Sequence, residues 1–175
     1  MDPFIKILTP SLPLTFNAAV WYAPSVNKST NCYSYALNCP EAGRRNPGHL
    51  STMRSEIEYK VSITSLREKL MSDGLIEISG HNAFSGEFHT VALRVQPGTD
   101  YHFLRLDNNG YWSHKNGHYV SYKDGSGEFI KDPRKAILRG GYSDFGGFFA
   151  IPKEGILFRP QVTLSTAEPS LENAK

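Results

Sequence analysis

The chain is predicted to fold as an α+β protein in which a short N-terminal helix packs on an antiparallel sheet. Three observations lead to this prediction. The first half of the chain carries helix signals, the second half alternates apolar and polar residues, and the alternating runs are separated by turn sequences such as Asn109-Gly110. Helical segments followed by a meander of strands are typical of α+β proteins.

The length and composition predict one globular domain. The chain has 175 residues, of which 39% are hydrophobic, and this is enough for a core of its own. We expect an extended segment over residues 1–19, a single domain over residues 20–164 and a disordered tail over residues 165–175.

The charge balance and the N-terminus limit the partners and the location. A net charge of +2, from 19 basic and 17 acidic residues, gives no argument for nucleic acid as a partner. No apolar run is long enough to span a membrane, and the N-terminus lacks the pattern of a cleaved secretion signal. We therefore expect a soluble monomer that is cytoplasmic or is exported without a cleaved signal.

The first helix is expected to begin at Cys32. Prolines at positions 3, 10 and 13 exclude a helix from the start of the chain, because proline lacks the backbone donor that a helix needs. A turn-rich run, Ala23–Lys28, precedes Cys32, and Leu37 can continue a buried helical turn. Pro40 and the glycine-containing loop after it end this helix.

A second helix is predicted over Leu66–Ser72. The pattern Ser65-x-x-Glu68 is that of a capping box, and Gly74 is a good stop after the last turn. The polar run Ser79–Gly86 is interpreted as a loop.

The rest of the chain is predicted to form strands. An Asn-Gly pair between two alternating runs is the strongest short hairpin signal that a sequence offers. The chain is expected to end on an edge that includes Leu157, Phe158, Val162 and Leu164. The main expected strands are Phe88–Val95, Tyr101–Leu106, Tyr111–Lys115 and Asp144–Ile151, with a further hairpin of Tyr119–Tyr122 and Glu128–Ile130.

The two cysteines, Cys32 and Cys39, are expected to be free thiols. They are too few for a disulfide scaffold, and neither lies in the Cys-x-x-Cys pair of zinc sites, so we expect no metal and no other cofactor. A thiol at a helix N-terminus lies beside free N–H groups and the positive end of the helix dipole, which favour the thiolate. Cys32 is therefore a candidate nucleophile if a base lies nearby, and the alternative is a small buried residue.

Histidines on the predicted strands supply candidate bases. His102 and His114 lie on consecutive strands and come nearly opposite each other across a short turn, although a slip of one residue would place them on opposite faces. One can then act as the base and the other can orient it. His89, at the start of the preceding strand, is the rival for either role. The three remaining histidines, His49, His81 and His118, are expected at the surface.

Two motifs carry a resemblance to a known family. They are NCYSYALN at positions 31–38 and DYHFLRLDNNGYWSHK at positions 100–115. The order of a helix-start cysteine and two strand histidines resembles the circularly permuted papain-like cysteine hydrolases of the NlpC and CHAP type, and the motifs are similar to those of an uncharacterised bacterial family. The resemblance implies a papain-like fold and a triad of Cys32, His102 and His114. We place Tyr22, Asn31, His89, Trp112 and Ser113 in an oxyanion and substrate-binding group around it.

The expected function is that of a thiol-dependent hydrolase or acyl-transfer enzyme. Cys32 would attack an amide of a peptide, protein or peptidoglycan-like substrate, as in a peptidase, an amidase or a glutamine deamidase, and the protein would serve as a bacterial effector or toxin. The alternative is a non-catalytic binding module that uses an aromatic sheet surface for peptide or glycan. The aromatic residues concerned, which would otherwise form core and cross-strand pairs, are Tyr101, Phe103, Tyr111, Trp112, Tyr119 and Tyr122.

Overall fold

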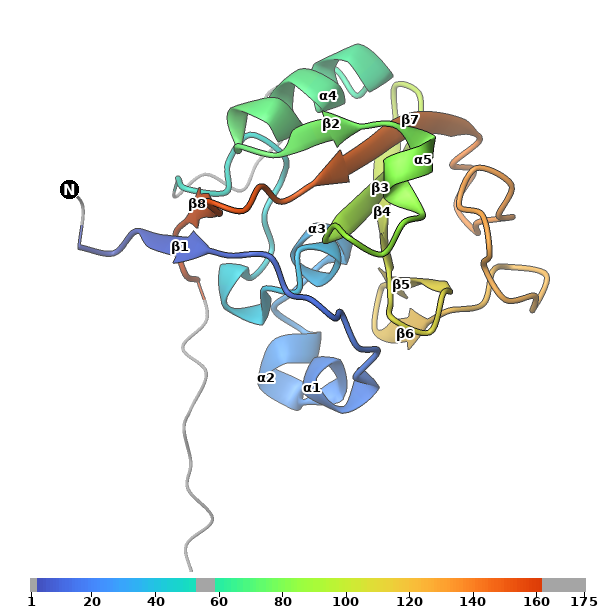
Figure 1. The fold of residues 1–175 in the computed structure, drawn as a ribbon, viewed down its shortest axis with the longest axis horizontal. Coiled ribbons are helices and arrows are strands. Elements are labelled where there is room, and N and C mark those ends of the chain that lie inside the picture. The colour runs from blue at the N-terminus through green and yellow to red at the C-terminus, as the bar shows by residue number, and fades with distance from the viewer. Residues whose placement is uncertain (1–2, 53–58, 162–175) are drawn as a thin grey trace, which may run out of the picture.

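A computed structural model describes residues 3–52 and 59–161 as a mixture of helices and antiparallel sheet (Figure 1). The predicted combination of α+β class and antiparallel sheet is confirmed. The main sheet has six strands, and every neighbouring pair in it is antiparallel. From one edge to the other, these strands are β2 (Ile76–Ile78), β7 (Asp144–Ala150), β3 (Thr90–Gln96), β4 (Asp100–Leu106), β5 (Trp112–Asn116) and β6 (Tyr119–Ser121).

The first and last strands form a separate ribbon. β1 (Lys6–Leu8) pairs antiparallel with β8 (Ile156–Phe158), and Ile7 lies opposite Leu157. In Figure 1 this ribbon lies to the left of the main sheet. The expected last edge is therefore present at residues 156–158, but it pairs with the start of the chain. Val162, Leu164 and the expected tail over residues 165–175 lie outside the described residues.

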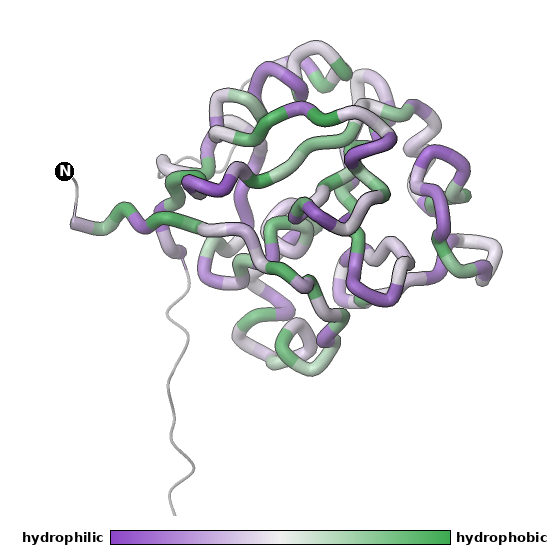
Figure 2. Tube along the Cα trace, in the orientation of Figure 1, coloured by the Kyte–Doolittle hydropathy of each residue, from purple (hydrophilic) through white to green (hydrophobic). Residues whose placement is uncertain are grey.

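Each face of the main sheet buries its own core. α3 (Cys32–Ala36) and α4 (Ile63–Ser72) contribute to a core that includes Val91, Leu93 and Phe103 of the sheet. Side chains of a strand alternate between its faces, so the intervening residues pack on the other side. There Ala92, Leu104, Trp112 and Phe148 meet α5 (Gly80–Ala83) and the loop of residues 130–138. Figure 2 shows hydrophobic stretches along the central strands and hydrophilic ones mostly in the outer loops.

The second predicted helix is present but begins earlier than predicted. Its N-cap is Ser62, whose hydroxyl accepts a hydrogen bond from the Ser65 backbone nitrogen at 3.1 Å. The capping box predicted at Ser65 is therefore wrong, because the first turn lies three residues nearer the N-terminus. The predicted end at Ser72 agrees with the structure, and Gly74 follows with a positive φ of 99°.

Several short elements were not predicted. They are too short to show a full hydrophobic period, which is the signal that sequence patterns provide. α5 lies in the segment interpreted as a loop, and β2 precedes it. The others are α1 (Ala18–Tyr22), α2 (Pro24–Asn27) and the 3₁₀ turn η1 (Pro40–Ala42).

The expected hairpin of residues 119–130 is present in part. β6 ends at Ser121, and the two arms then join through the bridge between Lys123 and Phe129 and through a hydrogen bond from the Ile130 backbone nitrogen to the Tyr122 carbonyl oxygen at 2.9 Å. The Asp124 carboxylate organises the turn between the arms, because its Oδ1 accepts from the backbone nitrogens of Ser126 and Glu128, at 2.9 and 3.2 Å.

Candidate functional site

The N-terminus of α3 is closed by its own cap. Asn31 Oδ1 accepts from the Ser34 backbone nitrogen, and the Asn31 backbone nitrogen donates to Ser34 Oγ, each at 3.1 Å. The Asn31 amide nitrogen also donates to the Arg45 carbonyl oxygen at 2.7 Å. Asn31 therefore holds the helix start and the neighbouring loop together, and part of the expected substrate-binding group is a structural cap.

The surroundings of the Cys32 thiol oppose the expected electrostatic effect. Cys32 is the first residue of the helix, as predicted, and it packs against the core that contains Phe103. Burial raises its pKa to about 12, and this effect outweighs the hydrogen bonds that lower it. A thiolate is the reactive form of cysteine, so this environment disfavours a nucleophile.

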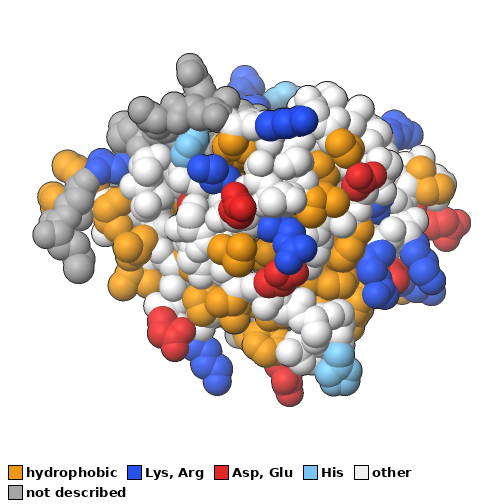
Figure 3. All heavy atoms as spheres, turned by 90° about the horizontal axis from the view of Figure 1, so that it is seen from above, with side chains coloured by type: hydrophobic (Ala, Val, Ile, Leu, Met, Phe, Trp, Pro, Cys, Tyr) orange, Lys and Arg blue, Asp and Glu red, His pale blue; other side chains and the backbone are white. Residues whose placement is uncertain are grey.

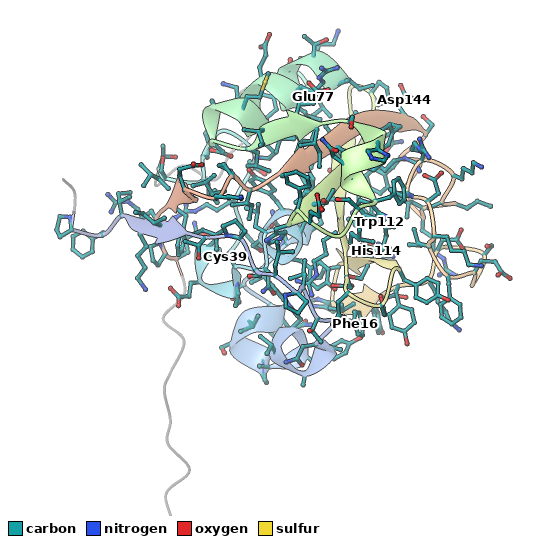
Figure 4. The ribbon with its side chains drawn as sticks, in the orientation of Figure 1. Phe16, Cys39, Glu77, Trp112, His114 and Asp144 are labelled. Atoms are coloured by element: carbon teal, nitrogen blue, oxygen red, sulfur yellow. The ribbon has the colours of Figure 1, made fainter. Side chains whose placement is uncertain are left out.

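The structure brings His102 and His114 together. β4 and β5 pair with His114 opposite Leu104, so His102 and His114 lie on the same face of the sheet. His102 Nε2 lies 2.8 Å from His114 Nδ1, and His114 Nε2 lies 3.1 Å from the Lys123 carbonyl oxygen. Burial lowers the pKa of both imidazoles, and His102 is affected most strongly. Figure 4 labels His114 beside Trp112 on β5.

Cys32 and His102 of the expected triad reach one cavity from different faces of the sheet. Cys32 packs on the face of Phe103, where the Tyr33 ring lies 4.8 Å from the Phe103 ring. His102 precedes Phe103 in β4, so its side chain points to the opposite face. Among the described residues, no histidine hydrogen-bonds the Cys32 thiol, although Cys32 and His102 line one cavity at the end of β4.

Three further residues of the expected group have structural roles. The Tyr22 phenol is exposed and contacts the backbone of Val120 at the edge of the sheet. Trp112 is fully buried in the core below α5. The Ser113 hydroxyl is buried on the other face, 2.7 Å from the Tyr35 hydroxyl. None of these positions forms an oxyanion site with Cys32.

The other histidines differ in their exposure. His89 is fully buried, its Nδ1 accepts from the Ser11 backbone nitrogen and its Nε2 lies 2.8 Å from the Ala36 carbonyl oxygen. It fixes the N-terminal segment and α3, and makes no contact with the histidine pair. The expectation of surface positions is met by His81 and His118, while His49 is buried.

Two buried cations that the sequence did not single out each hold several groups together, and Lys115 is the one that lines the cavity. The Lys115 ammonium donates to the carbonyl oxygens of Asn27, Thr30 and Gly117, at 3.0, 3.3 and 2.6 Å. Burial lowers its pKa to about 8. Arg105, fully buried, pairs with Asp107 at 3.1 Å. A charged residue inside an alternating strand is the signal that could have indicated both, because such a residue must find partners when buried.

The described ranges contain neither a cluster of metal-binding side chains nor a membrane-spanning helix. Within residues 3–52 and 59–161, no group of three or more His, Cys, Asp or Glu side chains is placed to hold a metal ion. The helices of the same ranges include none that is long and apolar enough to cross a bilayer. Both cysteines are free.

Comparison with known proteins gives one informative match. No family model matches the chain, and no solved structure does. A protein of Ruditapes philippinarum named "Insoluble matrix shell protein 1" is 39% identical over 138 residues, which cover 78% of this chain and 88% of that protein. The papain-like topology stays a prediction, since no solved structure supports it.

This match overturns the expected enzyme. The relative's name describes a matrix protein, whereas the motifs at positions 31–38 and 100–115 had suggested a hydrolase of the NlpC and CHAP type. The expectation of a cysteine peptidase, amidase or deamidase, and of a bacterial effector, is wrong. The finding that overturns it is the relative, whose name is that of a shell matrix protein. Cys32, His102 and His114 stay a prediction as a set, with His102 hydrogen-bonded to His114 and lining one cavity with Cys32.

Proposed function

The chain belongs to the family of insoluble matrix shell protein 1, and from this premise we propose that it is a non-catalytic matrix protein that binds peptide or glycan through an exposed aromatic surface. In this proposal the chain attaches to a matrix polymer and catalyses no reaction. The surroundings of Cys32 support it, because burial raises the pKa of the thiol and disfavours the thiolate that amide hydrolysis would need.

The observation that carries the proposal is a cluster of aromatic rings on the surface near β5 and β6. We define the aromatic surface as Phe16, Tyr111, Tyr122 and Phe129. The Phe129 ring lies 5.0 Å from the Tyr111 ring and 5.4 Å from the Tyr122 ring, centroid to centroid. Phe129 is 44% exposed, and the other three members are partly buried. Aromatic rings gathered at a surface mark a recognition site more often than scattered ones do.

The geometry of the rings suits a flat ligand face. Tyr111, Tyr122 and Phe129 lie within 24–35° of one another, whereas Phe16 stands at 74° to Tyr122 and borders the group. Figure 4 labels Phe16 near α1, a part of the chain distant in sequence from the other rings. Apolar sugar faces and peptide side chains both stack on such rings.

The aromatic surface is distinct from the aromatic core. Of the six residues considered from the sequence, Tyr101, Phe103 and Trp112 are buried and Tyr111, Tyr119 and Tyr122 reach the surface. Tyr119, on β6, is 75% exposed. Phe16 lies outside the expected strands, whereas Phe129 lies in the expected strand Glu128–Ile130.

Charges around the molecule do not favour a strongly charged polymer. Figure 3 shows Lys and Arg side chains interspersed with Asp and Glu over one face. Near the aromatic surface, the Lys123 ammonium lies 5.1 Å from the Phe129 ring centroid. A cation over one side of a ring fixes the orientation of that ring. Binding of a ligand to the aromatic surface then depends on ring stacking more than on the salt concentration.

A sedimentation assay tests the proposal. The chain is mixed with particles of an insoluble neutral polysaccharide in one arm and with gelatin-coated particles in the other, and the bound fraction is measured at low and high salt. We expect binding in at least one arm, a loss of several-fold in Phe129→Ala and Tyr111→Ala, and little effect of salt.

Two control variants complete the assay. Leu157→Ala removes an exposed apolar side chain on the β1–β8 ribbon, away from the aromatic surface, and should bind like the parent. Cys32→Ala should also bind like the parent, because the thiol takes no part. Unchanged binding by the Phe129 and Tyr111 variants would refute the role of the aromatic surface.

A further inference from the structure

A cavity of about 230 Å³ lies between the start of α3 and the ends of β4 and β5. Cys32, Arg44, Asp100, His102 and Tyr142 are among the residues that line it. Pockets for drug-sized ligands have volumes of about 300–1,000 Å³, so this one fits a smaller unit. The aromatic surface contributes no residue to the cavity.

The hydrogen bonds behind the cavity fix the protonation of His102. The Lys123 carbonyl oxygen can only accept, so His114 Nε2, 3.1 Å away, carries the proton and donates. Both imidazoles are neutral, because burial lowers their pKa. His114 Nδ1 is then an acceptor and takes the proton of His102 Nε2 at 2.8 Å. The remaining nitrogen of His102, Nδ1, therefore carries a lone pair and no proton.

This lone pair has no partner in the described part of the chain. His102 is 4% exposed, lines the cavity and makes no hydrogen bond through Nδ1 to any described residue. His102 Nδ1 is not among the fully buried side-chain atoms that lack a partner, so it is open to the cavity, where a ligand can donate a hydrogen bond to it. The ring is held firmly, because it lies 5.1 Å from the Tyr142 ring at an angle of 25°.

A second acceptor and a donor stand at the same cavity. Asp100 Oδ2 accepts from the Tyr142 hydroxyl at 2.9 Å, and Oδ1 accepts from the Tyr101 backbone nitrogen at 2.7 Å, which leaves each oxygen a further lone pair. The exposed Arg44 guanidinium uses its Nε for the Lys28 carbonyl oxygen, and its terminal nitrogens remain as donors at the rim. The Lys115 ammonium has no donor left for a ligand, because three carbonyl oxygens already accept its hydrogen bonds.

We propose that this cavity binds a single pyranose unit of a glycan, with one hydroxyl donating to His102 Nδ1 and others contacting Asp100 and Arg44. A hydroxyl both donates and accepts, so a ring of hydroxyls matches this mixture of acceptors and donors. Since the site uses different residues, it can be tested independently of the aromatic surface.

The hydrogen bonds from His102 through His114 to the Lys123 carbonyl oxygen also determine which chemical groups do not bind in the cavity. A carboxylate or carbonyl group at His102 would need a proton on Nδ1. A second proton on the ring is opposed by burial, which lowers the pKa of His102, and a shift of the existing proton would reverse both tautomers. His114 Nε2 would then turn a lone pair toward the Lys123 carbonyl oxygen, which is 3.1 Å away. Leaving two buried acceptors face to face is costly, so a group that only accepts is excluded.

Nuclear magnetic resonance of the ¹⁵N-labelled chain tests the assignment directly. The imidazole nitrogens report which one is protonated, and the expected state has the proton on Nε2 of both His102 and His114. Methyl β-glucopyranoside is then titrated, beside acetate as an acceptor-only probe and N-methylacetamide as a peptide probe. The glucoside should shift His102 Nδ1 in a saturable way, and acetate should not.

Two variants test whether the residues of the cavity bind the glucoside. Asp100→Asn should weaken the binding of the glucoside several-fold. Asp144→Asn, in β7 and outside the cavity, should leave that binding unchanged. The backbone spectrum shows whether each variant is folded, and the tautomer measurement on the parent chain needs no variant. A proton on His102 Nδ1, an equal response to acetate, tighter binding of N-methylacetamide, or no saturable shift with the glucoside would each overturn the proposal.

Discussion

The Tyr22 hydroxyl lies 3.2 Å from both the backbone nitrogen and the carbonyl oxygen of Val120. One phenol thus accepts from and donates to the same residue of β6, the last strand of the sheet. An unpaired strand edge is a template for pairing with other chains, and this contact occupies part of it. Tyr22, which was expected in the oxyanion and substrate-binding group, covers part of the open edge of the sheet.

Tyr22→Phe removes this contact without removing the ring. We expect a loss of about 1 kcal/mol in the free energy of unfolding, because two backbone groups lose a partner that water only partly replaces. Denaturant unfolding measures it. Tyr119→Phe, on the same strand and 75% exposed, is the matched control and should change stability by less than a few tenths of a kcal/mol. Equal stability of the two variants would contradict the role of Tyr22.

Arg105→Met should be among the most damaging single changes. The guanidinium pairs with Asp107, donates to the Tyr35 carbonyl oxygen at 3.1 Å and lies 4.1 Å from the Tyr35 ring centroid. Removing one partner of a buried pair leaves an uncompensated charge and costs about 3–5 kcal/mol. Arg67→Met, which breaks an exposed pair with Glu77, should cost less than about 1 kcal/mol. A comparable loss in both variants, by thermal or denaturant unfolding, would refute this ranking.

His89 should make the chain sensitive to acid. Burial lowers its pKa from 6.5 to about 4. The unfolded chain therefore binds this proton first, and the stability that neutral His89 contributes is complete above pH 6.5 and is lost as pH falls toward 4. A shift of this size corresponds to about 3 kcal/mol.

Unfolding free energies measured against pH test this sensitivity. His89→Gln should flatten the acid slope. The remaining slope combines His102 and His114, whose pKa values are also lowered, with Asp73 and Asp107, whose pKa values are raised by burial and which act in the opposite direction. His81→Gln, at an exposed position, should leave the profile unchanged. A parent profile that is flat between neutral pH and pH about 4 would refute the burial argument.

Cys32 should react slowly with alkylating reagents at neutral pH. Its pKa is raised to about 12 by burial, and the pKa of Cys39 is raised equally. In the Cys39→Ser background, the rate with iodoacetamide should rise about tenfold per pH unit, without a plateau, across the mildly alkaline range. A plateau near neutral pH would show a stabilised thiolate and would contradict the environment described.

Gly146→Ala should disturb the centre of the sheet. A Cβ there would lie 2.5 Å from Leu93 Cδ2, and the register of β3 with β7 shifts at this point, between Leu93 and Arg94. Overpacking of this kind costs about 1–3 kcal/mol. Gly80→Ala is the control, since the nearest atoms to its Cβ would be 3.7 Å away. Equal melting temperatures of the two variants would refute the close approach.

The strands were largely predictable from the sequence, and the site was not. Alternation and the Asn109-Gly110 turn place His102 and His114 on adjacent strands, so their meeting follows from local signals. The face on which they meet depends on how α3 packs against Phe103, and no local pattern contains that information. Short elements such as α1 and α5 could not be predicted from the sequence, because tertiary contacts rather than a hydrophobic period stabilise them.

The pairing of β1 with β8 has a mechanical consequence. Lys6 and Phe158 face each other at one end of the ribbon, and Leu8 and Ile156 at the other. A force that pulls residues 6 and 158 apart would open the ribbon like a zipper, one hydrogen bond after another, before the load reaches the six-stranded sheet. Such a ribbon yields under low tension, and unfolding under force follows the barrier of the part that carries the load. The chain would then lengthen by a first small step while its central sheet stays intact.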